Sequence, residues 1–450
     1  GNGSYSTADS YVKQVWDGRY TGIRMCNQLL ENIDRVPDLD PELKKRYIGE
    51  AKVLRAYSYY ELYTKFGDIP YTTKVLSIKE SMSIARTAKA TVIANVLADL
   101  DEVINGNYLP TSYDADNKGR ITRWAAMAIK AKIYLFEGNW TQVKNITSTI
   151  MTEGGFKLFG SYAGLFEIAN EYNSEVILDA QYRPTSREHQ MMYVFLPPTL
   201  GGYSQLSPLQ ELVDSYIMLD GKTIKETGTS FDESHPYANR DPRLKATVMY
   251  TGNSYTLADG TEVVINCEKG EGKDGYGVGS DCSATGYYIK KYWDNTYRAT
   301  LYSGLNPILI RYADILLMNA EALAELGELD KTAWDATIKP IRDRAGFTLA
   351  SAVEFPEGAS KDKLIEIVRN ERRSELALEG HRHKDIIRWR IADDVLNGWC
   401  HGLKTNEVVG TDNGYVRVEN RAFNANKHYL WPIPQAERDL NGNLEQNPNW

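Results

Sequence analysis

Apolar residues recur every three or four positions along the first third of the chain, which is the spacing of one face of an α-helix. The first such run predicts a helix over residues 10–34. A second helix is expected after Asp40, a residue type that caps helix N-termini, and Pro41, which fits the first helical turn. It should end at Gly67. Two long helices with a short connection predict a helical hairpin.

Three more helices are predicted before residue 153. Residues 93–103 carry apolar side chains at helical spacing, and the alanine-rich residues 122–138 form a slim partner that lets its neighbour approach closely. Asn139 is expected to cap a fifth helix that continues to residue 152. The first part of the chain therefore predicts paired helices, although its textual self-similarity is weak.

Helical periodicity returns in the second half of the chain. It is expected to resume at Ile308 and to end at Gly327. Asp330 is expected to cap the next helix, which should stop at Gly346. Pro340 lies inside that second helix and removes a backbone donor, so a kink or a break is predicted there.

Between residues 154 and 304 glycines, prolines and tyrosines interrupt short alternating runs, a pattern typical of loops with short strands. Long loops on a rigid scaffold often carry binding groups. Many of the 30 tyrosines fall in this part, and most of them are expected to serve in packing. They include Tyr193, Tyr203, Tyr237, Tyr250, Tyr255, Tyr276, Tyr287, Tyr288, Tyr292, Tyr297 and Tyr302.

Residues 361–390 combine helical spacing of apolar residues with more charge than one solvated face needs. Glu and Arg three residues apart meet on one side of a helix, so Arg372 with Glu375, and Glu379 with Arg382, are expected to pair locally. The alternative is a catalytic pair of carboxylates. Because no nucleophile or base stands nearby at a convincing spacing, the structural interpretation is favoured.

The same stretch closely resembles the signature of the SusD/RagB family, whose members are nutrient-binding lipoproteins of the bacterial outer surface. The matching motifs are Glu371-Arg372-Arg373, Glu375-Leu376-Ala377, Glu379-Gly380-His381-Arg382, Asp385 and Arg388-Trp389-Arg390. Segments elsewhere are similar too: Phe66-Gly67-Asp68-Ile69-Pro70, Asp241-Pro242-Arg243, Arg311-Tyr312-Ala313-Asp314, Ala320-Glu321-Ala322, Arg344-Ala345-Gly346, Trp431-Pro432-Ile433-Pro434, Glu437, Asn441 and Gln446-Asn447-Pro448. The resemblance thus covers essentially the whole chain.

The resemblance implies a single domain over residues 1–450 that is mainly α, with tetratricopeptide-like helix pairs and a loop-rich half containing short strands. A helical scaffold would occupy residues 10–152 and 305–395, a ligand-binding part residues 154–304, and a closing segment residues 396–450. Family members usually carry a signal, a lipidated cysteine and further residues ahead of the first helix. That N-terminal segment is expected to be missing here, together with the lipid anchor.

The function implied by the resemblance is non-catalytic binding of a nutrient at the outer membrane, and an oligosaccharide is the expected ligand. Delivery would be to a SusC-like TonB-dependent transporter. Two other classes stay open from the sequence. One is a glycan-degrading enzyme, which would need two carboxylates about 5 to 10 Å apart. The other is a protein-interaction or peptide-binding scaffold.

Composition narrows the partners. With 25% charged residues and a formal net charge of −8, the chain has no basic stripe that would follow phosphates, so no nucleic-acid partner is expected. No apolar run approaches the length of a membrane span, and residues 1–30 lack the pattern of a secretion signal.

No cofactor is expected, although calcium binding stays open. The four cysteines lack the close pairs of zinc sites. Cys267 and Cys282 flank a glycine-rich loop, and the sequence leaves open whether they form a disulfide. His381 and His383 stand two residues apart, roughly on opposite sides of a helix, and so cannot readily share a metal.

Catalytic and nucleotide-binding motifs are weak or missing. Residues 270–275 match GxGxxG and follow a strand-like run, but the next residues, Tyr276-Gly277-Val278-Gly279, cannot open the helix that a dinucleotide site requires. A mobile loop is the favoured interpretation. The sequence contains no GxSxG elbow, Walker loop or HExxH motif.

A sugar ring presents apolar CH faces and a rim of hydroxyls, so an aromatic face beside Asn, Asp or Arg is enough to bind it. Residues 293–298 supply this mixture within six positions. By the resemblance, the segment ahead of the first helix would contribute as well. The candidate ligand-binding residues are Asn2, Tyr5, Arg187, Tyr193, Tyr203, Trp293, Asp294, Asn295, Tyr297 and Arg298.

Overall fold

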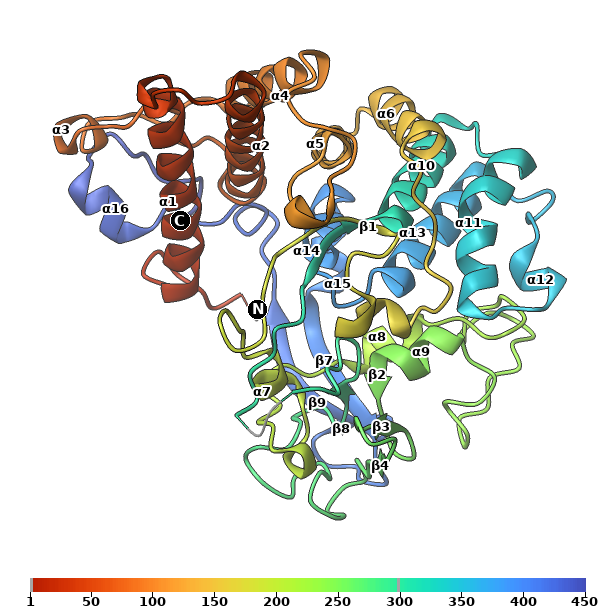
Figure 1. The fold of residues 1–450 in the computed structure, drawn as a ribbon. Coiled ribbons are helices and arrows are strands. Elements are labelled where there is room, and N and C mark those ends of the chain that lie inside the picture. Colours follow the sequence, from red (N-terminus) through yellow and green to blue (C-terminus); the bar gives the residue numbers. More distant parts are fainter. Residues whose placement is uncertain (1–2, 298–299) are drawn as a thin grey trace. The chain divides into compact units, whose positions relative to one another are not determined.

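The computed structural model describes residues 3–297 and 300–450 (Figure 1). The chain divides into two compact units, each made of several segments. The first unit comprises Gly1–Ile150, His383–Asn397 and Arg421–Trp450. The second comprises Met151–Arg382 and Gly398–Asn420. Long helices dominate the first unit, whereas the second combines helices with several small sheets.

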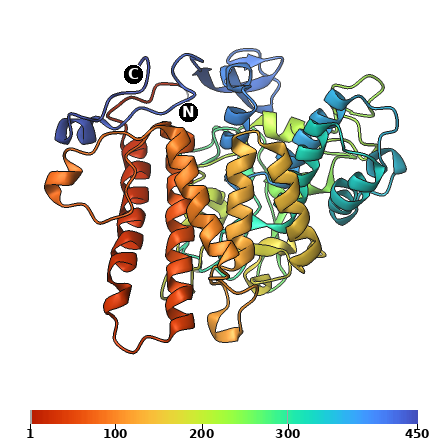
Figure 2. The same ribbon diagram turned by 90° about the horizontal axis from the view of Figure 1, so that it is seen from above.

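The first unit is built on helices that pack against their sequence neighbours, as the tetratricopeptide-like prediction requires. Helix α1 packs against α2, α2 against α4, and α4 against α5. Figure 2 shows α1 and α2 lying side by side along their length. The helices of this part are α1 (Ser10–Asn32), α2 (Pro41–Phe66), α3 (Ile78–Ser81), α4 (Lys89–Asn105), α5 (Arg123–Phe136) and α6 (Trp140–Glu153).

The helix boundaries follow local chemistry. Asp40 accepts a hydrogen bond from the Leu43 amide at 2.8 Å, and Thr122 caps α5 by accepting from the Ala125 amide. Gly67 ends α2 with a φ of 72°, a conformation that glycine adopts without strain. The predicted cap Asp40, the predicted end at Gly67 and the five predicted helices of residues 10–152 are confirmed.

The C-terminal segment completes the core of the first unit. The Trp431 ring packs edge-on against Phe66 with centroids 5.8 Å apart, and the Trp431 amide donates to the Lys65 carbonyl. Asn447 donates to the carbonyls of Phe66 and Trp431 at 2.9 and 2.7 Å. The closing motif therefore fixes the end of α2. The remaining helices in or reaching into this unit are α14 (Arg382–Arg388), α15 (Ala392–Val395) and α16 (Gln435–Leu440).

Three longer helices support the second unit. They are α10 (Tyr312–Leu326), α11 (Lys331–Ala345) and α13 (Lys361–Glu375), and α10 packs against both of the others. Their shared core contains Leu317, Trp334 and Val368, each at most 1% exposed. The short helices of this unit are α7 (Met191–Phe195), α8 (Gln210–Ser215), α9 (Pro242–Thr247) and α12 (Ala350–Val353).

Antiparallel strand pairs hold the loop-rich part together, and short strands were predicted there. The pairs are β1 (Val176–Asp179) with β6 (Ile308–Arg311), β2 (Val248–Met249) with β5 (Tyr288–Ile289), and β3 (Ser254–Thr256) with β4 (Glu262–Val264). A three-stranded sheet has the order β7 (Asn397–Lys404), β9 (Tyr415–Ala422), β8 (Thr411–Asp412). The fold is mainly α, with strands confined to these pairs and this triplet among the described residues.

Three details differ from the predicted elements. Ile308–Arg311 is strand β6, paired with β1, so the helix begins only at Tyr312. Helix α11 continues through Pro340 without a break. The charged stretch is interrupted after α13, because Leu378 and Gly380 have φ values of 64° and 80°, which a helix does not allow.

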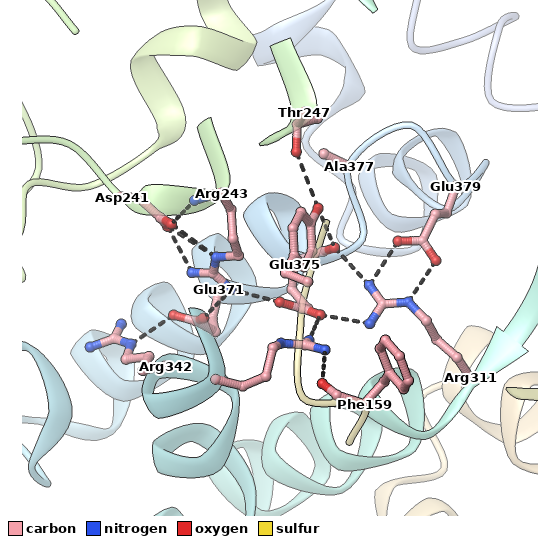
Figure 3. Close-up of polar contacts among 12 residues, drawn as sticks. Phe159, Asp241, Arg243, Thr247, Arg311, Arg342, Glu371, Glu375, Ala377 and Glu379 are labelled. Atoms are coloured by element: carbon pink, nitrogen blue, oxygen red, sulfur yellow. Dashed lines mark hydrogen bonds and ion pairs between the residues drawn. The ribbon is translucent and has the colours of Figure 1, made fainter. Parts of the chain in front are cut away.

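The charged signature forms a buried network of ion pairs in the second unit (Figure 3). Arg311 contacts Glu175, Glu375 and Glu379 at 2.6–2.7 Å. Arg243 contacts Asp241, Glu371 and Glu375. Glu375 and Glu379 are thus held by residues distant in sequence rather than by Arg372 and Arg382, so the predicted local pairs are wrong. Arg372 instead lies 2.6 Å from Asp314 of α10.

This network ties several elements of the second unit to the end of α13. Burial alone would raise the pKa of Glu375, but Arg344, Arg311 and Arg243 hold it well below its usual range. Each carboxylate oxygen of Glu375 has an arginine partner, so the charges are matched as well as buried. Glu371, Glu375 and Glu379 of the signature therefore stabilise the fold of the second unit.

Candidate ligand-binding site

The second unit contains a cavity of about 570 Å³, within the range of small-ligand sites. Its walls come from the start of α8, the loop before α9, the turn between β2 and β3, the segment after β4, the residues before β5, the end of β7 with the residues after it, and the start of β9. The lining residues are Gln210, Glu233, Ser234, His235, Pro236, Tyr237, Ala238, Tyr250, Thr251, Gly252, Cys267, Glu268, Gly286, Tyr287, Leu403, Lys404, Thr405, Asn406 and Tyr415. Four of these lining residues are tyrosines.

Two of these tyrosines form a stacked pair. The ring centroids of Tyr237 and Tyr250 lie 4.0 Å apart, and the ring planes differ by 17°. Both rings are half-buried and pack against the core that contains Tyr255 and Tyr288. A flat aromatic surface supported by a rigid core suits the apolar face of a ligand ring.

A chain of hydrogen bonds fixes the floor of the cavity. The hydroxyls of Tyr237 and Tyr287 lie 3.3 Å apart, and the Tyr287 hydroxyl donates to Gln210 Oε1 at 2.6 Å. The Gln210 amide then donates to Asp214. Burial raises the pKa of Tyr287 well above its ordinary value, so this hydroxyl keeps its proton.

The rim of the cavity carries charge. Lys404 Nζ lies 2.7 Å from Glu233 Oε1 and also stands over the Tyr415 ring. Burial, with the nearby carboxylates of Asp214 and Glu233, raises the pKa of Tyr415 to about 12. His235 pairs through Nδ1 with Asp232 at 2.8 Å. The basic groups of the rim are therefore each matched by a carboxylate.

Some polar groups of the lining have no partner among the described residues. Within residues 3–297 and 300–450, the Tyr250 hydroxyl and the side chains of the exposed residues Asn406 and Glu268 have no hydrogen-bond partner. These groups can donate to or accept from a ligand without breaking an existing contact. The combination of a supported aromatic surface and open polar groups can bind a sugar.

The predicted residues Trp293 and Tyr297 pack against the same core, which contains Tyr255 and Tyr288, but they lie outside the cavity lining. Trp293 lies 5.0 Å from Tyr255 and 5.2 Å from Tyr297, centroid to centroid, and its Nε1 donates to the Thr256 carbonyl. The Tyr297 hydroxyl donates to the Leu200 carbonyl. The structure thus brings Trp293 and Tyr297 together.

Two further predicted tyrosines form their own pair. Tyr193 and Tyr203 stack with centroids 4.2 Å apart, and Tyr203 is 40% exposed. Arg187 lies elsewhere in the loops, with its guanidinium 5.3 Å from the centroid of the Tyr182 ring. None of these side chains lines the 570 Å³ cavity. Their role in binding stays a prediction.

The other predicted residues have varied surroundings. Asp294 is 2% exposed and accepts hydrogen bonds from Thr296 and Ser303, so its carboxylate is occupied in shaping the loop. Asn295 is half-buried. Tyr5 belongs to the first unit, where its ring packs against His428, Trp431 and Trp450, and burial raises its pKa to about 12. Asn2 and Arg298 lie outside the described residues.

Comparison with known proteins identifies the family. Residues 165–450 match the model of the SusD family, and residues 2–135 match a model described as starch-binding associating with outer membrane. The chain belongs to the SusD family. SusD-like protein P25 of Formosa agariphila is 28% identical over 410 residues, covering 86% of this chain and 71% of that protein.

Solved structures agree with the SusD fold. A SusD-like carbohydrate binding protein from Bacteroides fragilis is 29% identical, with a TM-score of 0.88 over 99% of this chain and 88% of that one. Surface glycan-binding protein A from Bacteroides fluxus is 22% identical, with a TM-score of 0.71 over 99% of this chain and 86% of that one. The second likeness shows the fold alone.

The structure of this SusD-family chain also bears on disulfides, metal ligands and membrane spans. No disulfide joins Cys267 and Cys282. Burial raises the pKa of Cys267 to about 12. In residues 3–297 and 300–450, no three His, Cys, Asp or Glu side chains gather as metal ligands would. None of the helices in this part combines the length and the apolarity needed to cross a bilayer.

The glycine-rich motif forms turns. Gly270 and Gly272 have φ values of 74° and 60°, and the next helix in the described chain starts only at Tyr312. A dinucleotide site needs a helix directly after the glycines, so the arrangement does not support one.

His383 belongs to the first unit. Burial, with nearby Lys65 and Lys384, lowers the pKa of His383 to about 4.

The cavity residues were missed by sequence reasoning. Tyr237, Tyr250 and Tyr287 were noted only as members of a tyrosine-rich part, and Lys404 and Tyr415 lie in the predicted closing segment. No local motif joins them, because they come from separate loops that only the folded chain brings together. The one available signal was the density of tyrosines among glycines and prolines.

Proposed function

We propose that this chain binds an oligosaccharide without changing it, and that the ligand lies in the tyrosine-lined cavity of the second unit. The observation that carries the proposal is the stacked pair Tyr237–Tyr250 beside open polar groups. Family membership and the carbohydrate-binding relative from Bacteroides fragilis support the class of ligand. The sequence-predicted cluster around Trp293 is the second candidate location.

The biological setting of the proposal follows from the family. The family description that matches residues 2–135 mentions association with the outer membrane. We infer that the protein acts at the outer surface and passes its ligand to a SusC-like TonB-dependent transporter. The helix pairs of the first unit would pack against this partner, as the family resemblance implies. A lipid anchor would hold the protein at the membrane.

The enzyme alternative finds little support in the cavity. Ser234, His235 and Asp232 contact one another, which resembles the composition of a hydrolase triad. However, the Ser234 hydroxyl and the Asp232 carboxylate both contact the same ring nitrogen, Nδ1 of His235, at 3.1 and 2.8 Å. A triad needs the serine and the carboxylate on opposite nitrogens, so this turn favours a structural role.

Calorimetric titration against a panel of oligosaccharides tests the function. The proposal expects saturable binding to at least one glycan, and it expects prolonged incubation with that glycan to release no new reducing ends. Absence of binding across a broad panel would favour a protein-interaction scaffold. Release of reducing ends would instead favour a glycan-degrading enzyme.

Two single substitutions decide between the two locations. Tyr250→Ala removes one ring of the cavity stack, and Trp293→Ala removes the centre of the predicted aromatic cluster. Binding lost in the first variant and kept in the second supports the cavity. The reverse result moves the site to the Trp293 cluster. Tyr11→Ala is a matched control, since this ring is 62% exposed and belongs to the first unit.

A further inference from the structure

The charge of the cavity walls indicates which class of glycan they accept. We propose that the cavity selects uncharged oligosaccharides over those that carry carboxylate or sulfate groups. This inference rests on the proposed function and on the cavity as its location. It concerns three formally charged lining residues, Glu233, Glu268 and Lys404, all within the described chain.

Lys404 is the one lysine or arginine among the lining residues, and it is already neutralised. Its ammonium lies 2.7 Å from the Glu233 carboxylate and also stands over the face of the Tyr415 ring. The charge of Lys404 is thus shared with Glu233, so an anionic sugar gains less from it than from a lysine without a carboxylate partner.

The remaining formal charge of the lining is negative. Glu268 is exposed at the cavity wall and has no ion-pair partner among the described residues. His235 adds no uncompensated positive charge, since Asp232 lies 2.8 Å from its Nδ1. A ligand carboxylate near Glu268 is therefore repelled, and salt screens this repulsion.

Hydrogen bonding favours the same class. The Glu268 carboxylate only accepts hydrogen bonds, and sugar hydroxyls can donate to it. A sugar carboxylate or sulfate has no hydrogen to donate at neutral pH, so it cannot form the hydrogen bond that a hydroxyl in its place could donate to Glu268. The Tyr250 hydroxyl and the Asn406 amide can serve either role toward an uncharged sugar.

The test uses matched ligands. Neutral gluco-, manno- and galacto-oligosaccharides are compared with the same compounds after oxidation of their C6 hydroxymethyl groups to carboxylates, by calorimetry at low and at high salt. The neutral form of the glycan that binds should have the higher affinity, by about tenfold at low salt. This difference in affinity between the two forms, called the affinity gap, should be smaller at high salt.

The substitution Glu268→Gln should narrow the gap in the same way, mainly by improving binding of the oxidised form. Glu271→Gln is the matched control, because it makes the same change of net charge three residues away and outside the lining. It should leave the gap unchanged. Both residues are exposed, so neither change should affect folding.

The outcomes separate the inference from the proposed function. Equal or tighter binding of the oxidised glycan, or a gap that Glu268→Gln leaves unchanged, overturns the inference while the binding function stands. Binding that survives Tyr250→Ala places the ligand elsewhere and overturns the inference as well. No binding of any member of either series overturns the proposed function itself.

Discussion

The buried ion-pair network and the tyrosine-lined cavity belong to the same unit and use polar side chains in opposite ways. In the network, the carboxylate of Glu375 meets arginines on both oxygens and is fully buried. In the cavity, the Tyr250 hydroxyl and the Glu268 carboxylate have no protein partner among the described residues. Matched polar groups stabilise a fold, whereas open ones are available to a ligand. The family signature marks the network, and the candidate function lies in the cavity.

The largest expected effect comes from removing one carboxylate charge from the buried ion-pair network. Glu375→Gln keeps the shape of the side chain but removes the charge that Arg243, Arg311 and Arg344 share. Leaving buried charges without a partner should lower the free energy of unfolding by about 3 to 5 kcal/mol. Chemical denaturation monitored by circular dichroism measures this loss.

A control on the same helix separates the network from the helix itself. Glu366 is 61% exposed in its side chain, and Glu366→Gln should change the free energy of unfolding by less than about 0.5 kcal/mol. Equal changes in the free energy of unfolding for the two substitutions would show that the buried network contributes no more to stability than an exposed residue of the same helix.

The next largest effect concerns binding. Tyr250→Ala removes a half-buried ring that faces the cavity, and the loss of its apolar contact should weaken glycan binding at least about tenfold. Tyr250→Phe keeps the ring and removes only the open hydroxyl, so it should weaken binding less. Calorimetry measures both values. An unchanged affinity in Tyr250→Ala would contradict the assignment of the cavity.

A smaller effect on binding is expected at the sequence-predicted cluster. Trp293→Ala breaks the contacts with Tyr255 and Tyr297, so it should lower stability by about 1 to 3 kcal/mol. If the cavity is the binding site, glycan affinity stays within about twofold of the native value. Thermal unfolding and calorimetry on the same sample distinguish the two effects.

The smallest effect is a dependence of stability on pH. His401 contacts Glu211 at 2.8 Å and Asp412 at 3.0 Å. Burial alone would lower the pKa of His401, but hydrogen bonds to Asp412 and Glu211 raise it above its ordinary value.

Because the folded-state pKa of His401 is raised, its contribution is fully present below its unfolded value of about 6.5 and is lost as the pH rises through the folded value. The size is at most about 1 kcal/mol, since the ring is partly exposed. Denaturation of the native protein and of His401→Gln at pH 5.5 and pH 8.5 should show a difference only at the lower pH. A difference that grows with pH would contradict the assignment.

Features encoded locally were predictable from the sequence. Asp40 and Gly67 fix the ends of α2 through contacts a few residues away, so this helix was predicted closely. Helix α4 (Lys89–Asn105) extends beyond the predicted residues 93–103 at both ends. Strand β6 was missed because the short apolar run Ile308–Ile310 suits either a helix or a strand, and only pairing with β1 makes it a strand.

Features that depend on distant contacts could not be predicted in the same way. The carboxylates of Glu375 and Glu379 could pair with arginines along the helix or across the fold, and spacing alone favoured the wrong choice. Likewise, Tyr250 and Tyr415 reach one cavity from segments that share no motif. The cluster around Trp293 was proposed because its residues are neighbours in sequence, which is the only proximity that a sequence shows.

A crystal structure with the tightest-binding neutral oligosaccharide tests the central claim most directly. The account predicts an intact glycan in the cavity, with a sugar ring against the Tyr237–Tyr250 stack and hydroxyls within hydrogen-bond distance of Tyr250 and Glu268. A glycan bound elsewhere, or one whose glycosidic bond has been cleaved, would contradict it.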